Sequence, residues 1–339
     1  MSFGFNGFWA TPGLAGEPTI NLYPIPTAFS FPTGVAVDAR GMVWFVELNG
    51  NKLGVFQPST ETFLEYDIPT TRSYPTDVEI GKRGLVWFTE QDGNQIGVFN
   101  PATKVFKEYE IPTPLSQPAR LAIDSNGHIW FTEFNGNKIG RFDPKKEAFT
   151  EYLIPTPQSQ PIGIAVDSRG TIWFVEAQGN KLGRLSPGTG VIKEYPLPIQ
   201  FSIPSELAID KKGNIWFSAR RDGKLVKFIP NSSGFKEFNL PNKGVLEGMV
   251  VDKAGNIWYC NKGGGKVGMF NISEASFMEL DIPIGGQPFA IAMDDTNTIW
   301  FTDIGKNNIG RLAVKGLSGK GGLSVKFKPG ETTKTLTNP

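Results

Sequence analysis

Residues 129–141, Ile-Trp-Phe-Thr-Glu-Phe-Asn-Gly-Asn-Lys-Ile-Gly-Arg, decide the fold because close copies of this stretch recur along the chain. An apolar strand around Trp130 is followed by Asn-Gly-Asn-Lys, a sequence typical of a tight hairpin, and then by a second strand from Ile139. Seven tryptophans, 42 or 43 residues apart, mark the copies: Trp44, Trp87, Trp130, Trp173, Trp216, Trp258 and Trp300.

Each copy contains two further strand-like segments. Before the tryptophan strand lies a short apolar run, such as residues 163–167, which ends in a turn of the form Asp-x-x-Gly. After the hairpin comes a segment such as residues 150–155, which ends in proline. Four antiparallel strands repeated about every 43 residues are the signature of a propeller blade, so the sequence predicts an all-β, seven-bladed β-propeller.

The two ends of the repeat predict how the ring closes. The seventh copy stops after residues 309–312, and its missing fourth strand matches residues 21–26 near the start of the chain. We therefore expect the N-terminal strand to join the last blade, which removes an exposed sheet edge. This division predicts an N-terminal arm at residues 1–18, the propeller at residues 19–314 and a basic, Gly- and Thr-containing tail at residues 315–339.

Composition excludes several classes of function. A net charge of +1 over 339 residues argues against nucleic-acid binding. No apolar run is long enough to span a membrane. One cysteine and one histidine exclude an intrachain disulfide and any site that needs two imidazoles. His128 precedes the Trp130 strand at the end opposite the hairpin, where we expect a structural role.

The compartment stays open. Two Asn-x-Ser sequons, at residues 231–233 and 271–273, and the Thr-containing tail favour a secreted or cell-surface location. A start at Met1 without a visible signal peptide favours the opposite.

One acidic position recurs with the repeat. A carboxylate follows the tryptophan by three residues in five copies: Glu47, Glu90, Glu133, Glu176 and Asp303. A lysine often follows five residues later, as Lys138 does after Glu133. Either a ring of carboxylates attracts cations to one end of the channel, or each blade carries an ion pair or turn cap at its hairpin.

Departures from the repeat are a better guide to a site, because the shared residues build the scaffold. In a propeller the first strand of each blade lines the channel, and four copies carry a charge near its start: Asp77, Arg120, Glu206 and Glu247. The fifth and sixth copies also replace the recurrent acid with Ala219-Arg220-Arg221 and Asn261-Lys262. Such charges form either an ion-pair cluster around channel water or a site for a ligand or metal.

The order Pro-x-Gly-Ile-Ala-Val-Asp, Ile-Trp-Phe-Thr-Glu, Asn-Gly-Asn-Lys-Ile-Gly-Arg and Glu-Tyr-x-Ile-Pro-Thr-Pro closely resembles the virginiamycin B lyase (streptogramin lyase) family over residues 19–314. The resemblance implies a seven-bladed propeller that linearises a cyclic depsipeptide antibiotic by elimination, using Mg²⁺ and two histidines. Glu247 and Phe289 stand at the histidine positions, and Gln287 and Ile304, with Asp303 adjacent, stand where the family has metal-binding carboxylates.

We therefore predict a family member that binds a small molecule or a protein partner on its channel face without the lyase activity. The candidate ligand-binding residues are Asp77, Arg120, Glu206, Arg220, Glu247 and Phe289. The alternative is a lyase or a lactone or ester hydrolase in which Mg²⁺ or Ca²⁺, held by Asp77, Glu206 and Glu247, polarises the carbonyl.

Overall fold

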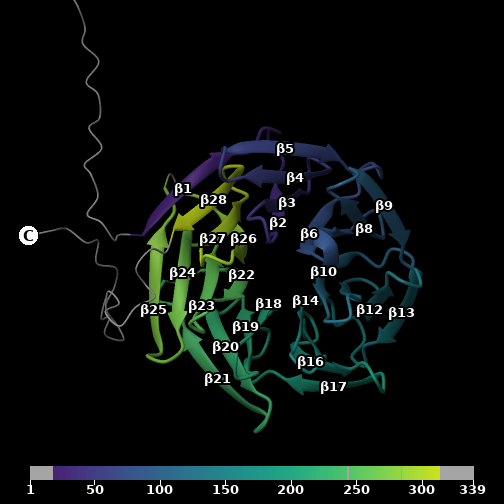
Figure 1. Cartoon of the computed structure of the whole chain (residues 1–339). Coiled ribbons are helices and arrows are strands. Elements are labelled where there is room, and N and C mark those ends of the chain that lie inside the picture. Colours follow the sequence, from purple (N-terminus) through teal and green to yellow (C-terminus); the bar gives the residue numbers. More distant parts are fainter. Residues whose placement is uncertain (1–17, 243, 284, 314–339) are drawn as a thin grey trace, which may run out of the picture.

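The computed structural model describes residues 18–313 except residues 243 and 284. In this range 28 strands form seven four-stranded antiparallel sheets, arranged as the blades of a ring (Figure 1). This confirms the predicted all-β, seven-bladed propeller. The helical structure in this range is the short 3-10 helix η1 (Lys82–Gly84). Apart from Pro18, the predicted arm and tail lie outside the described residues.

Each blade has the same strand order from the centre of the ring outward. The innermost strands of blades 1 to 7 are β2 (Pro32–Val37), β6 (Pro75–Ile80), β10 (Pro118–Ile123), β14 (Pro161–Val166), β18 (Pro204–Ile209), β22 (Leu246–Val251) and β26 (Pro288–Met293). The second strands, which carry the tryptophans, are β3 (Val43–Glu47), β7 (Val86–Glu90), β11 (Ile129–Glu133), β15 (Ile172–Glu176), β19 (Ile215–Ala219), β23 (Ile257–Asn261) and β27 (Ile299–Asp303).

The outer half of each blade completes the sheet. The third strands are β4 (Lys52–Gln57), β8 (Gln95–Asn100), β12 (Lys138–Asp143), β16 (Lys181–Ser186), β20 (Lys224–Ile229), β24 (Lys266–Asn271) and β28 (Asn308–Ala313). The outermost strands are β5 (Thr62–Asp67), β9 (Val105–Glu110), β13 (Ala148–Leu153), β17 (Val191–Pro196), β21 (Gly234–Asn239), β25 (Ser276–Asp281) and β1 (Thr19–Pro24).

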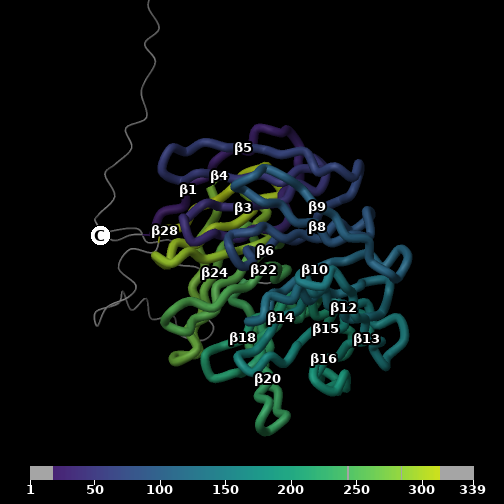
Figure 2. Tube along the Cα trace, turned by 45° about the vertical axis from the view of Figure 1, so that its right-hand side comes forward, coloured from purple at the N-terminus to yellow at the C-terminus, as the bar shows by residue number. Residues whose placement is uncertain are grey.

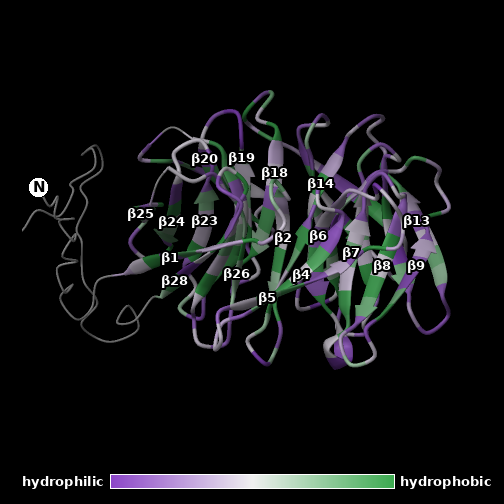
Figure 3. Cartoon of the chain, turned by 90° about the horizontal axis from the view of Figure 1, so that it is seen from above, coloured by the Kyte–Doolittle hydropathy of each residue, from purple (hydrophilic) through white to green (hydrophobic). Residues whose placement is uncertain are grey.

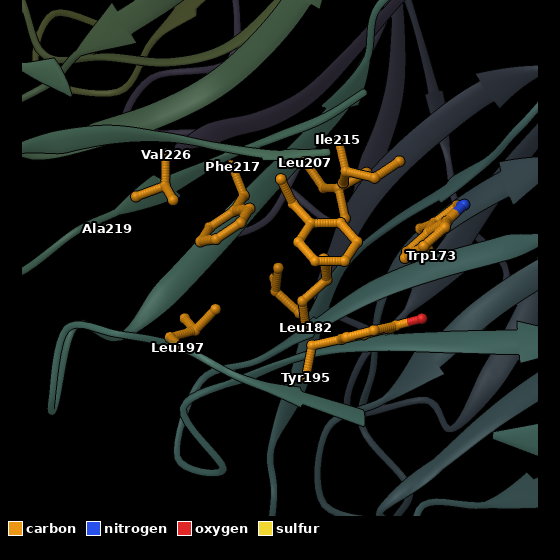
Figure 4. Close-up of a cluster of buried hydrophobic side chains, with 11 residues drawn as sticks. Trp173, Leu182, Tyr195, Leu197, Leu207, Ile215, Phe217, Ala219 and Val226 are labelled. Atoms are coloured by element: carbon orange, nitrogen blue, oxygen red, sulfur yellow. The ribbon is translucent and has the colours of Figure 1, made fainter. Parts of the chain in front are cut away.

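The hydrophobic core lies between neighbouring blades. Figure 4 shows one such layer, in which Trp173, Leu182 and Tyr195 of blade 4 pack against Leu207 and Phe217 of blade 5. The second-strand residues are buried along their whole length in every blade, because one face contacts the preceding blade and the other the next. Blade-to-blade packing of large apolar side chains therefore holds the ring together.

The ring closes as the sequence predicts. Strand β1 pairs antiparallel with β28, with Thr19 opposite Ala313 and Pro24 opposite Asn308. Figures 1 and 2 show this purple first strand outside the yellow last strands. Blade 7 is thus built from both ends of the described chain, and its innermost strand β26 contacts β2 of blade 1.

The two faces of the ring are formed by different turns, as the edge-on view in Figure 3 shows. Pro118, the first residue of an innermost strand, pairs with Glu133, the last residue of the second strand. The starts of the innermost strands and the hairpins after the second strands therefore share one face, which we call the mouth face. The turns between the first and second strands form the opposite face.

A recurrent asparagine shapes the loops of the mouth face. In blade 3 the Asn137 amide donates hydrogen bonds to the carbonyls of Ile154 at 3.1 Å and Thr156 at 3.0 Å. Its oxygen accepts the backbone N–H of Ser159 at 2.7 Å. The hairpin thus fixes the loop that leads into the next innermost strand, and this loop positions the residues at the channel mouth.

Candidate functional site

The six predicted site residues all lie at the mouth face. Asp77, Arg120, Glu206, Glu247 and Phe289 occupy the second or third position of innermost strands on five different blades, and Arg220 directly follows the second strand of blade 5. In blades 1 and 4 the third position of the innermost strand is glycine (Gly34 and Gly163), and the neighbouring blade leaves no room for a side chain there. A Cβ on Gly34 would lie 2.8 Å from the Asp77 Cα, and one on Gly163 would lie 2.5 Å from the Ser205 carbonyl oxygen.

Arg120 is the centre of the site. Its Nε and Nη2 donate to one carboxylate oxygen of Glu206 at 3.0 and 2.7 Å, which links blade 3 to blade 5 past blade 4. Its guanidinium carbon also lies 5.7 Å from the ring centroid of Phe289 on blade 7. Burial lowers the pKa of Arg120, but the Glu206 and Asp77 carboxylates outweigh this and raise it overall. Arg120 is therefore charged and interacts with three blades.

A second ion pair joins blades 5 and 6. Arg220 Nη2 lies 2.6 Å from a Glu247 oxygen, and the Glu247 side chain is only 3% exposed. Burial raises the pKa of Glu247, partly offset by the Arg220 charge. The Lys262 ammonium of blade 6 lies 5.4 Å from the Phe289 ring centroid and, within the described chain, forms no ion pair. Phe289 thus has a cation from blade 3 and another from blade 6 near its ring.

Asp77 binds the backbone of the next blade. Its Oδ2 accepts the N–H of Leu121 at 2.9 Å. Burial raises its pKa to about 6, although the Arg120 charge and this hydrogen bond oppose the rise. Asp77, Arg120 and Glu206 therefore form one electrostatic cluster, and Arg220 with Glu247 adds a second pair beside it.

Glu79 is a further charged residue of β6 that was not predicted as part of the site. It follows Asp77 by two residues in β6, and its side chain is exposed, whereas its neighbours Val78 and Ile80 pack into a blade core. The other six copies have Ala or Val here: Ala36, Ala122, Ala165, Ala208, Val250 and Ala292. The same comparison of copies, extended by two residues, identifies it.

The residues at the mouth do not fit the family's magnesium site. Across the described range no three His, Cys, Asp or Glu side chains are grouped to hold a metal. Asp303 caps a turn, because its Oδ1 accepts the N–H groups of Gln287 at 2.7 Å and Gly305 at 3.1 Å. The metal ligands predicted at Asp77, Glu206 and Glu247 stay a prediction, and the two latter carboxylates already pair with arginines.

The recurrent acids of the second strands form a different feature. Glu47, Glu90, Glu133 and Glu176 are fully buried, and their oxygens have no hydrogen-bond partner in the described structure. The predicted ion pair between this acid and the hairpin lysine is wrong. The lysine pairs instead with a carboxylate of the outermost strand, as Lys138 does with Glu151 at 2.7 Å. In blade 6 Asn261 replaces the acid and donates to Glu279 at 3.0 Å. A protonated glutamic acid can make the same bond.

Burial and the nearby outermost-strand glutamates raise the pKa of Glu47, Glu90 and Glu176 to about 8 and that of Glu133 to about 7. The folded protein thus keeps protons that the unfolded chain releases above its ordinary pKa of 4.5. We expect the free energy of unfolding to fall by more than about 1.4 kcal/mol between pH 5 and pH 8.5, measured by urea denaturation.

Glu133→Gln is the control for this pH dependence. The variant keeps the shape and a donor but cannot ionise, so it should reduce the slope of stability against pH. A wild-type stability that rises from pH 5 to pH 8.5 would contradict protonated, buried glutamates.

Comparison with known proteins supports the family resemblance. The sequence model of the virginiamycin B lyase family matches residues 13–130 and 106–321. The structure is similar to virginiamycin B lyase from Staphylococcus aureus, with 29% identity, a TM-score of 0.82 and coverage of 88% of this chain and 99% of that one. A streptogramin B lyase structure gives 27% identity, a TM-score of 0.82 and coverage of 87% and 97%.

More distant structures share the fold alone. An extracellular domain of a one component system from B. thetaiotaomicron has 14% identity and a TM-score of 0.70, covering 86% of this chain and 39% of that one. No curated protein sequence matches the chain. None of the described helical structure is long and apolar enough to cross a membrane.

Proposed function

Because the chain belongs to the virginiamycin B lyase family, we propose that it is a family member that binds a small molecule or protein partner at the channel mouth and lacks the lyase activity. The observation that carries this proposal is the ion-paired cluster of Arg120 and Glu206, which extends across the channel to Phe289. The cluster breaks the sevenfold repeat at the face where the resemblance implies the catalytic histidines, and it puts an aromatic ring at one of their positions.

The histidine content supports the loss of lyase activity. A catalytically inactive His-to-Ala variant of the staphylococcal lyase has been solved with quinupristin. The present chain has one histidine, His128, and it lies on the opposite face with its Nδ1 2.8 Å from Asp124. Glu247 and Phe289 stand at the mouth instead. Glu247 is paired with Arg220, and a phenyl ring cannot transfer a proton.

The charges at the mouth support a binding role. Buried ion pairs are poor stabilisers, since desolvation offsets most of their attraction. Gly34 and Gly163 show that small residues satisfy the fold at the same positions. Arg120, Arg220 and Lys262, next to the Phe289 ring, provide donors and an apolar surface for a ligand.

Quinupristin tests the proposed loss of activity. Elimination opens the ring without changing the mass, so chromatography must separate the linear product from the substrate. We expect no linear product with or without Mg²⁺, while the staphylococcal lyase, as positive control, converts the same sample. Magnesium-dependent linearisation by this protein would refute the proposal.

Calorimetric titration of chelator-treated protein with Mg²⁺ and Ca²⁺ distinguishes the alternative. We expect no saturable heat, because arginines already neutralise Glu206 and Glu247. Saturable binding that is lost in a Glu206→Gln, Glu247→Gln double variant would instead support the metal-assisted lyase or hydrolase.

A further inference from the structure

A carboxylate caps the turn of the opposite face in six of the seven blades. It belongs to the aspartate six residues before the tryptophan, and its Oδ2 accepts the indole N–H at 2.9–3.3 Å. The six residues are Asp38, Asp124, Asp167, Asp210, Asp252 and Asp294. In blades 1 and 4 the same carboxylate also pairs with an arginine, namely Arg40 at 2.8 Å and Arg169 at 3.7 Å.

Blade 2 lacks this carboxylate but keeps both donors. Gly81 stands at the aspartate position, in the turn that contains η1. The indole of Trp87 has no acceptor among the described residues, whereas the other six blades all provide one. Arg83 occupies the position of Arg40 and Arg169, and in the described chain it pairs with no carboxylate. Because glycine replaces aspartate at position 81, the Trp87 indole and the Arg83 guanidinium lack the carboxylate acceptor that the other blades provide.

The two donors line a cavity between blades 2 and 3. Its volume is about 470 Å³, within the range of small-molecule sites. Lys82 and Lys145 add positive charge to its wall, while Leu85 and Ile123 supply apolar surface. A Cβ on Gly81 would lie 2.7 Å from the indole nitrogen of Trp87, so the indole packs directly on the glycine backbone.

The acidic groups at this cavity are already engaged. Asp124 lies behind His128 and does not line the cavity; it accepts the Trp130 indole at 3.1 Å and contacts His128 at 2.8 Å. Asp143 accepts the backbone N–H of Lys145 at 3.0 Å. The cations Lys82, Arg83 and Lys145 therefore face the cavity without a carboxylate of their own in the described structure.

We propose that this cavity binds the carboxylate of an external ligand, which supplies the hydrogen-bond acceptor that an aspartate provides in the other blades. The ligand is a carboxylic acid with a small apolar or aromatic group. Its carboxylate accepts hydrogen bonds from Trp87 Nε1 and Arg83, and its apolar group contacts Leu85 and Ile123. This site lies on the opposite face from the mouth, so it is independent of the proposed function.

Indole N–H signals in ¹H–¹⁵N spectra of the full chain test the site directly. The Trp87 signal is the one that disappears in the spectrum of Trp87→Phe. We expect benzoate to shift this signal saturably and the uncharged benzamide to leave it unshifted. Arg83→Gln should weaken benzoate binding about tenfold, because it removes a charge-assisted bond. Arg40→Gln, at the same position in blade 1, should leave the binding unchanged.

Gly81→Asp provides the second arm: the Trp87 indole must shift to admit the new Cβ, and the aspartate carboxylate then accepts its N–H, so benzoate binding should be abolished. N-acetyl-Gly-Phe tests whether the carboxylate can be a peptide C-terminus, and its C-terminal amide is the control. A site that accepts peptide ends will bind the free acid and not the amide, whereas a site for small acids will bind neither. A Trp87 signal that does not respond to benzoate would overturn the proposal. So would Arg83→Gln or Gly81→Asp with wild-type affinity.

Discussion

Arg120→Met should destabilise the protein by about 3 kcal/mol at pH 8, measured by urea denaturation. The Glu206 side chain is only 12% exposed, so loss of its partner leaves a nearly buried carboxylate without a counter-charge. The effect is large because the other charge stays buried after its partner has gone.

The Arg120→Met, Glu206→Met double variant is the critical comparison. Removing both charges should recover most of the lost stability, since apolar residues of similar size replace a buried pair at little cost. Lys107→Met, which breaks the half-exposed Lys107–Glu147 pair, should change stability much less. If Arg120→Met and Lys107→Met unfold at the same urea concentration, loss of Arg120 does not leave Glu206 buried and unpaired.

Gly140→Val should destabilise the protein by about 3 kcal/mol, because valine would overpack the blade core. Gly140 lies opposite Phe131, and a Cβ at this position would lie 2.1 Å from the Phe131 Cζ. Six blades have glycine opposite an aromatic ring of the second strand: Gly54, Gly97, Gly140, Gly183, Gly268 and Gly310. In each of these blades the aromatic ring covers the glycine Cα, so the third strand has no room for a side chain at this position.

Gly188→Val is the matched control, because a Cβ on the exposed Gly188 would meet nothing within 4 Å. We expect its unfolding free energy to stay within about 0.5 kcal/mol of wild type. Blade 5 shows that an adapted blade accepts valine, since Val226 lies opposite Phe217. There the Phe217 and Phe235 rings are 6.4 Å apart, against 6.0 Å for Phe131 and Phe149. Equal stability of the two variants would show that Phe131 moves aside freely.

The sequence predicts the blades and the closure because each depends on local pattern. The spacing of the tryptophans sets the repeat, and the missing fourth strand of the last copy identifies residues 21–26 as its partner. It also places Arg220 and Glu247 on neighbouring blades among the charges at the channel mouth, and in the structure these two residues form an ion pair. These features need only the order of the strands.

The contacts of individual side chains could not be predicted, because they depend on the distances between strands and blades in the folded ring. Arg120 binds Glu206 two blades away, and no strand periodicity encodes a contact across a channel. Lys138 pairs with Glu151 rather than Glu133, because the Glu133 side chain turns inward onto Gly136. Gly81, where the other six copies have aspartate, can be read from the sequence, but the cavity beside it depends on how blades 2 and 3 pack.

The closure of blade 7 also affects how the protein is made. Strand β1 leaves the ribosome before the other 27 described strands, but Thr19 cannot pair until Ala313 has been synthesised. At translation rates of about 5–20 residues per second, the delay is roughly 15–60 seconds. Throughout this time β1 has no partner strand and exposes Ile20 and Leu22, and unpaired strands promote aggregation. Nascent chains should therefore be most vulnerable to misassembly before the last blade emerges, when the other six blades are already complete.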